Sequence, residues 1–203
     1  ATPFFPGDVI HFKGGENFVG MILINSNQSG KSGTPVKFKS YDQGRAIIDA
    51  GTADGIWIYN AEFVEVRDLI IKGSGVLSNY GAGIYASISL TDKMLDGIVI
   101  DNVDVSGFYW MGIGVATEGN TTKGFLNLRI TNATVHNNGI PGIETSGSWD
   151  EVSGTSAFNH VGMYIGYTKT YQNHGISSYA NNWSGTGILM AGVENGLIEY
   201  CEA

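Results

Sequence analysis

Apolar residues recur along the chain in short runs, and most of these runs open with a Gly-Ile pair. The pairs begin at Gly55, Gly83, Gly112, Gly142 and Gly187. The first four lie about 30 residues apart, and the last interval equals one such period plus a loop. A repeat of this length indicates a stacked architecture in which each period is one structural unit.

A second set of repeats keeps the same register. It consists of segments whose first, fourth and sixth positions are apolar or small, at 66–71, 100–105, 130–135, 165–170 and 198–203. A helix would need apolar residues at three- and four-residue spacing over about ten or more positions, whereas these runs are short and rich in Val, Ile and Thr. The segments are therefore predicted to be strands.

Strands that recur in one chain direction without amphipathic helices between them predict a chain that coils round a single axis. Each strand then pairs in parallel with its counterpart one coil further on. Positions two and three of each segment must bend, and Asn102 and Asn132, which tolerate left-handed backbone angles, stand there. Two ladders of inward residues follow: Val66, Ile100, Ile130, Ile165 and Ile198 in one, and Leu69, Val103, Ala133, Thr168 and Cys201 in the other.

With this pattern the chain resembles the right-handed parallel β-helix superfamily of pectate lyases, polygalacturonases and related carbohydrate-active proteins. The repeats carry the resemblance over residues 45–203, and residues 6–15 and 34–41 look like the first coils of secreted bacterial β-helix proteins. The expected fold class is all-β, a right-handed single-stranded parallel β-helix of about five to six coils. The resemblance implies a secreted, periplasmic or extracellular location and a polysaccharide or oligosaccharide partner, but no single chemistry, because such folds host many.

We expect one domain over residues 1–203, with N-terminal coils or a cap over 1–50 and regular coils over 51–203, since no linker-like segment divides the chain. The inward residues of the last strand, Ile198, Cys201 and Ala203, continue the ladders and no capping element follows them. Further coils beyond Ala203, or an end-on contact with another chain, are therefore expected. No apolar run is long enough to predict a membrane span.

The charge balance is acidic, with 11 basic and 19 acidic residues and a net charge of −8. This argues against a nucleic-acid partner, which needs a basic surface, and mildly against a polyanionic glycan. The four histidines lack metal-ligand spacing, and the single cysteine falls in a ladder of packing residues, so neither a metal site nor a disulfide is predicted. No cofactor is expected; calcium held by carboxylates stays open for a lyase that acts on uronate polymers.

Alternation in the Gly-Ile strands turns each Ile inward and the next residue outward. The outward columns contain three large aromatic residues on adjacent coils, Trp57, Tyr59 and Tyr85, beside small residues such as Gly114. Aromatic faces pack against the apolar face of a pyranose, so these columns predict a sugar-binding groove with a depression next to the rings. The alternative is that loops from the N-terminal coils cover the three rings.

Loops between strands supply the expected walls of this groove, at 87–96, 116–123, 145–160 and 177–184. The longest follows Glu144 and contains Trp149, Asp150 and Glu151. Glycoside hydrolysis needs two carboxyl groups about 5 to 9.5 Å apart, and Glu144 with Asp150 or Glu151 is the pairing that the repeat places beside the aromatic residues. The candidate catalytic residues are Glu144, Asp150 and Glu151, and the candidate substrate-binding residues are Trp57, Tyr59, Tyr85 and Trp149; ordinary solvated carboxylates are the alternative for each acid.

Other lyase and hydrolase signatures are missing. Lys169 is predicted to form a cross-strand ion pair with Glu202 rather than to act as the base of a lyase. The chain contains neither the adjacent Asp-Asp with a downstream Gly-His-Gly of polygalacturonases nor the Arg-Pro pair of pectate lyases. The favoured function is therefore a glycoside hydrolase acting on an extracellular polysaccharide. The alternatives are a non-catalytic polysaccharide-binding module, a calcium-assisted polysaccharide lyase and a structural, adhesin-like β-helix.

Overall fold

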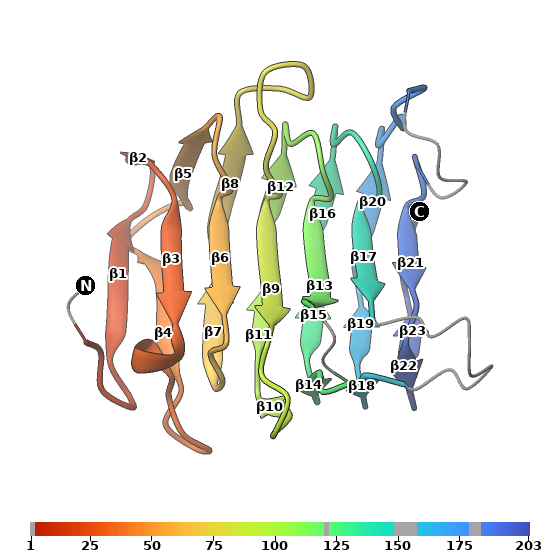
Figure 1. Ribbon diagram of the computed structural model, residues 1–203. Coiled ribbons are helices and arrows are strands. Elements are labelled where there is room, and N and C mark those ends of the chain that lie inside the picture. Colours follow the sequence, from red (N-terminus) through yellow and green to blue (C-terminus); the bar gives the residue numbers. More distant parts are fainter. Residues whose placement is uncertain (1–2, 120–121, 148–157, 179–183) are drawn as a thin grey trace.

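The computed structural model is a right-handed parallel β-helix built from four sheets (Figure 1). It describes residues 3–119, 122–147, 158–178 and 184–203. Within those ranges the single helical element is the short 3-10 helix η1 (Ser26–Gln28), and no helix is long and apolar enough to cross a membrane. The all-β, coiled architecture predicted from the repeats is confirmed.

Sheets 1 and 2 run along one side of the coil and are formed by the six-residue repeat segments and their N-terminal counterparts. Sheet 1 contains β1 (Val9–Lys13), β4 (Val36–Tyr41), β7 (Val64–Arg67), β11 (Val99–Asp101), β15 (Arg129–Thr131), β19 (Tyr164–Gly166) and β23 (Leu197–Glu199). Sheet 2 contains β2 (Asn17–Val19), β5 (Ala46–Gly51), β8 (Leu69–Gly73), β12 (Asp104–Ser106), β16 (Thr134–His136) and β20 (Lys169–Tyr171).

Sheets 3 and 4 complete each coil. Sheet 3 holds the Gly-Ile strands and faces the viewer in Figure 1: β3 (Ile22–Asn25), β6 (Ile56–Tyr59), β9 (Ile84–Ile88), β13 (Ile113–Thr117), β17 (Ile143–Ser146) and β21 (Ile188–Met190). Sheet 4 is short: β10 (Leu95–Asp96), β14 (Phe125–Leu126), β18 (His160–Val161) and β22 (Val193–Glu194). The sheet pairings are parallel throughout.

The predicted bend divides each repeat segment between two sheets. The third position has a positive φ of 51 to 55° in every coil, at Asp68, Asn102, Asn132, Tyr167 and Tyr200. A left-handed residue reverses the pleat and interrupts the ladder, so the residues before it join sheet 1 and those after it join sheet 2. The repeat segments therefore contribute to two sheets instead of one. With the Gly-Ile strands in sheet 3 and the short strands in sheet 4, each regular coil contains four sheets.

The inward ladders form the core. Val66, Ile100, Ile130 and Ile165 are fully buried and lie in register across sheet 1. The second ladder is equally buried from Leu69 to Thr168. In the last coil the ladders become accessible, with Ile198 at 43% exposure and Cys201 partly buried. The Lys169 ammonium lies 2.9 Å from the Glu202 carboxylate, which confirms the predicted cross-strand ion pair.

The glycine of each Gly-Ile pair is required by close packing between sheets 2 and 3. A Cβ added at Gly83 would overlap Val105 Cγ1 from sheet 2 and the carbonyl oxygen of Gly112 from the next coil. Gly55 meets Ile71 in the same way one coil earlier. The repeated glycine therefore marks the place where the turn into sheet 3 passes over the inward side chains of sheet 2.

Candidate functional site

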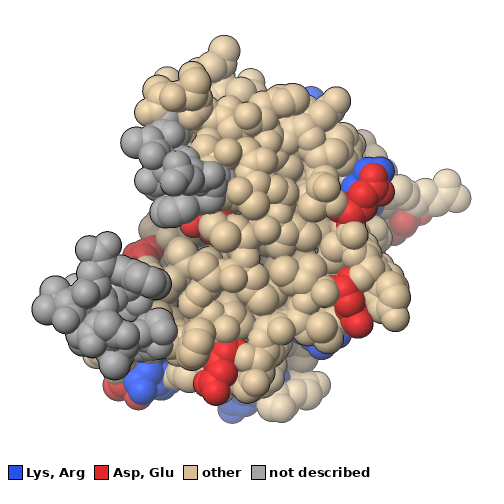
Figure 2. Space-filling model, turned by 90° about the vertical axis from the view of Figure 1, so that its right-hand side faces the viewer, with Lys and Arg blue, Asp and Glu red and all other residues tan. Residues whose placement is uncertain are grey.

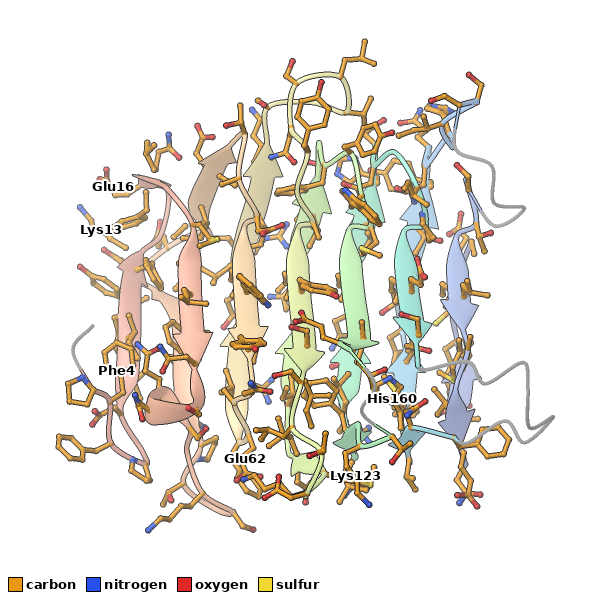
Figure 3. The ribbon with its side chains drawn as sticks, in the orientation of Figure 1. Phe4, Lys13, Glu16, Glu62, Lys123 and His160 are labelled. Carbon is orange, nitrogen blue, oxygen red and sulfur yellow. The ribbon has the colours of Figure 1, made fainter. Side chains whose placement is uncertain are left out.

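A groove of about 370 Å³ opens on sheet 3, where the turns that lead into β9 and β13 meet the outward side chains of β6 and β9. Figure 3 shows the side chains of this face directed toward the viewer. The lining residues are aromatic, small or acidic: Asp54, Trp57, Tyr80, Gly81, Ala82, Tyr85, Trp110, Met111 and Glu118. Such a mixture of flat rings and carboxylates suits a ligand with both apolar faces and hydroxyl groups.

The predicted aromatic residues lie together on the outer face of sheet 3. Trp57 and Tyr85 are partners in register, with their ring centroids 6.5 Å apart, and both line the groove. The Trp57 indole donates a hydrogen bond of 2.9 Å to Ser87 Oγ, which fixes its orientation. The ring centroid of Tyr59 lies 5.2 Å from that of Trp57, and the Tyr59 hydroxyl forms a hydrogen bond of 2.8 Å with Ser89 Oγ. Trp57 and Tyr85 are therefore presented to a ligand, whereas Tyr59 supports Trp57 from beside the groove.

The depression expected beside the rings is filled. A Cβ at Gly114 would lie 2.8 Å from Met111 Cγ and 2.9 Å from Tyr85 Cδ2, so these two side chains already cover the glycine. The open space lies instead over the turns before β9 and β13, at Tyr80, Gly81 and Trp110. The missing Cβ lets the Tyr85 ring lie close against the strand rather than leaving room for a sugar.

Three carboxylates act on the Tyr85 hydroxyl. Burial, together with the negative charges of Glu118, Asp54 and Glu144 in that order of effect, raises the pKa of Tyr85 to about 12. The acids come from three different coils, before β6, after β13 and within β17. Stacking of the coils thus brings acidic groups that are up to 90 residues apart in the chain close enough to affect Tyr85; Asp54 and Glu118 line the groove, and Glu144 does not.

Glu144 points outward from β17, as predicted from the alternation. It is the partner of Gly114, which in turn is the partner of Tyr85, so it stands two strands from Tyr85 on the same face. The side chain is half-buried, and this burial raises the pKa of its carboxyl group. A carboxyl group with a raised pKa retains its proton to a higher pH, as a general acid must.

Asp54 and Glu118 hold different positions at the groove. Asp54 Oδ1 accepts a 2.7 Å hydrogen bond from the backbone N–H of Ala82, which ties the turn before β9 to the preceding coil. Glu118 follows β13 directly, and its backbone N–H donates to the Ile88 carbonyl at 2.8 Å. One oxygen of Asp54 therefore has a structural role, while Glu118 is held through its backbone and lines the groove.

The other sequence-predicted residues, Trp149, Asp150 and Glu151, lie in 148–157, outside the described residues. Sequence reasoning missed Asp54, Tyr80, Trp110 and Glu118 as lining residues. Asp54 immediately precedes the first Gly-Ile pair, and Glu118 falls in the predicted wall segment 116–123. The sequence therefore indicated where both residues lie along the coil, but not where their side chains point. In the described ranges no group of three or more His, Cys, Asp or Glu side chains is placed to hold a metal ion.

A buried histidine secures the end of the strand that carries Glu144. His160, in β18, is fully buried; its Nδ1 accepts the Phe125 backbone N–H at 3.1 Å, and its Nε2–H donates to the Ser146 carbonyl at 2.9 Å. The ring stacks on Phe125, with centroids 5.9 Å apart. This pattern requires the neutral imidazole with its proton on Nε2.

We therefore expect stability to fall on mild acidification. Burial lowers the pKa of His160, so its contribution to the free energy of unfolding is present above the unfolded pKa of about 6.5 and is lost as the pH falls through the lower folded value. Chemical denaturation should show that the unfolding free energy of the parent falls steeply between pH 7.5 and 4.5. It should fall less steeply in His160→Gln, which is already less stable than the parent at pH 7.5. His174→Gln, at an exposed histidine, is the control and should follow the parent.

No protein-family model matches the chain, and neither does any curated protein sequence. Among solved structures, the native GH136 lacto-N-biosidase from Eubacterium ramulus is similar, with a TM-score of 0.69 and 13% identity over 98% of this chain and 46% of that one. Pectate lyase Pel9A is similar at a TM-score of 0.53 and 15% identity, over 91% and 50%. The chain spans about half the length of these proteins, and at such identities the likeness establishes the β-helix fold alone.

Proposed function

We propose that this protein is carbohydrate-active, and that it binds a glycan in the groove on sheet 3 and hydrolyses a glycosidic bond there. The observation that carries the proposal is the meeting of aromatic side chains with three carboxyl groups that all act on the Tyr85 hydroxyl. Two similar folds belong to proteins whose names describe action on glycans, a lacto-N-biosidase and a pectate lyase. We also propose a secreted or periplasmic location, in keeping with such a substrate.

Trp57 and Tyr85 are the proposed sugar-stacking residues. Their rings sit side by side on adjacent coils, and a spacing of about 4.8 Å between strands is close to the length of one sugar unit. The hydrogen bond from Trp57 to Ser87 holds the indole in place before any ligand arrives. A preordered aromatic surface lowers the entropy cost of binding.

Glu144 is the proposed general acid. Burial keeps it protonated to a higher pH than an exposed glutamate, so it can donate its proton to the glycosidic oxygen as the bond to the anomeric carbon breaks. Glu118 is the proposed second carboxylate, because its charge has the largest effect on Tyr85 and its carboxylate lines the groove. It would either remove a proton from the attacking water or attack the anomeric carbon itself, according to the separation of the two groups. Asp150 and Glu151 are the alternative second carboxylates.

A non-catalytic polysaccharide-binding module is the second candidate. It is favoured by the position of Glu144, which acts on the Tyr85 hydroxyl but is not among the residues that line the groove. Such a module needs the aromatic surface but no acid pair, so the two functions differ in whether new reducing ends appear when the protein is incubated with the glycan that it binds.

Trp57→Ala is expected to weaken glycan binding by about 1–3 kcal/mol, roughly 5- to 150-fold in Kd, because the indole provides much of the apolar contact. A panel of oligosaccharides is first screened for binding and for release of reducing sugar, and the best ligand is then titrated by calorimetry. Tyr41→Ala, at a tyrosine of sheet 1 that is 46% exposed, is the matched control and should bind like the parent. Unchanged affinity in Trp57→Ala would place the site elsewhere.

A further inference from the structure

The groove carries charge of one sign only. Its described lining includes two acidic residues and no Lys, Arg or His, and Glu144 adds a third carboxyl group within reach of Tyr85. In the sequence, the segments 120–121, 148–157 and 179–183, which lie outside the described residues, contain no Lys, Arg or His, and 148–157 contains Asp150 and Glu151. No cationic side chain is therefore available from those segments to offset the acids.

Lys and Arg are absent from the strands of this face, and Lys93 and Lys123, on the loops that follow β9 and β13, are not among the residues that line the groove. None of the six strands of sheet 3 contains Lys or Arg, whereas sheets 1 and 2 carry Lys13, Lys37, Lys39, Arg67, Lys72, Arg129 and Lys169. Several of these cations are paired there, as Arg67 is with Glu65 and Asp101 and Lys37 is with Glu65. Figure 2, seen from the C-terminal end with sheet 3 on the left, shows acidic atoms on that side, and basic and acidic atoms together along the lower and right-hand edges.

From this asymmetry, and resting on the proposed function, we infer that the groove selects glycans by charge: it takes uncharged or amine-bearing sugars and rejects uronic acids and sulfated sugars. A uronate carboxylate placed over Trp57 would add a like charge beside Asp54 and Glu118 in a partly desolvated site, where repulsion is weakly screened. A protonated amine would meet both these carboxylates and the electron-rich aromatic faces. A uronate-specific site would need the reverse arrangement, with cations lining the groove.

The first test needs no glycan. The protein contains four tryptophans, so the test uses a Trp149→Phe/Trp183→Phe background, in which the fluorescence of Trp57 and Trp110 reports which ions enter the groove that they line. With each quenching constant divided by that for free N-acetyltryptophanamide, we expect a larger relative constant for caesium than for iodide at low ionic strength. The double variant Asp54→Asn/Glu118→Gln should raise the iodide constant about two- to fivefold, since the local anion concentration follows the local potential. Quenching by neutral acrylamide should not change, which shows that the fold and the exposure of the rings are preserved.

Glu16→Gln is the matched control, because it removes one acidic charge at the turn between β1 and β2, in the first coil and away from the residues that line the groove (Figure 3). It should leave the iodide and caesium constants as in the parent. Equal relative constants for the two ions in the parent, or no increase for iodide in the double variant, would overturn the inference.

The second test compares glycans matched in backbone and different in charge. The probes are oligogalacturonate with its carboxyl-reduced counterpart, and chito-oligosaccharides with and without N-acetyl groups, each titrated at 20 mM and 300 mM salt. We expect the uronate form to bind at least about 10-fold more weakly than its reduced form at low salt, with the gap closing at high salt. The amine form should bind at least as tightly as the acetylated form.

Different results would contradict the charge selection and the proposed glycan hydrolysis. Tighter binding of the uronate form, with hydrolysis, would overturn charge selection and leave a glycan hydrolase. If none of the probes binds but the ion selectivity of the groove is as expected, the proposed function is contradicted on these glycans, and the charge selection stands as a property of the groove.

Discussion

Glu144→Gln is expected to lower kcat for glycan hydrolysis by about 10²- to 10⁴-fold while KM changes little. The substitution keeps the shape of the side chain and removes the proton that the leaving oxygen needs, and a positioned general acid contributes a factor of this size. Initial rates of reducing-end release on the best ligand of the panel, over a range of substrate concentrations, measure both constants. A variant that retains the parental kcat would exclude Glu144 as the acid, and with it the roles proposed for the site.

The pH profile gives an independent check on the same residue. Because burial raises the pKa of Glu144, activity in the parent should fall as the pH rises through that value, and this basic limb should be absent from the residual activity of Glu144→Gln. Glu65→Gln, at a glutamate of sheet 1 that pairs with Arg67, is a control acid away from the groove and should retain the parental profile.

Glu144→Gln should leave stability equal or higher although it lowers activity. A carboxyl group with a raised folded pKa contributes stability below its unfolded pKa of about 4.3 and loses that contribution as the pH rises through the folded value. At pH 7 the ionised Glu144 therefore opposes folding, and Glu144→Gln is expected to melt at the parental temperature or slightly above it. The difference should vanish near pH 4, and a clear loss of Tm at pH 7 would show that the carboxylate is structural.

Gly83→Ala is expected to cost roughly 3 kcal/mol of unfolding free energy, a fall in Tm of about 6–12 °C for a chain of this size. The added methyl group would overlap both Val105 Cγ1 and the Gly112 carbonyl oxygen, and the second of these is backbone in the neighbouring coil that cannot rotate away. Sheets 2 and 3 must separate locally, and the turn that positions Tyr80, Gly81 and Ala82 at the groove moves with them. Thermal and urea unfolding, followed by circular dichroism, measure the effect.

Gly51→Asn is the matched control for this glycine. Gly51 has a φ of 58° and an added Cβ there meets no atom within 4 Å, so Asn can adopt the required left-handed backbone without overlap. We expect a change within about 1 kcal/mol. If Gly83→Ala were as mild as Gly51→Asn, close packing would not be the reason for the repeated Gly-Ile pair.

The sequence by itself determined the coil. A repeat of about 30 residues, strict alternation after each Gly-Ile pair and a polar residue at the third position of the second repeat were enough to predict the parallel pairing, the two inward ladders and the bend. These features depend on backbone hydrogen bonding between neighbouring coils and on the side-chain period of two, which are properties of any strand with this pattern. The outward positions of Trp57, Tyr85 and Glu144 followed from the same alternation.

Only the tertiary structure decided where the groove lies and which acids surround it. Asp54, Tyr80, Trp110 and Glu118 stand on turns, where neither period two nor the coil repeat determines the direction of a side chain. The sequence predicts open space at Gly114, but the side chains of Met111 and Tyr85 cover it. The space left by a missing Cβ can be filled by neighbouring side chains as readily as by a ligand. The pKa changes of Tyr85 and Glu144 arise from burial and from charges on other coils, and these exist only after the coils have stacked.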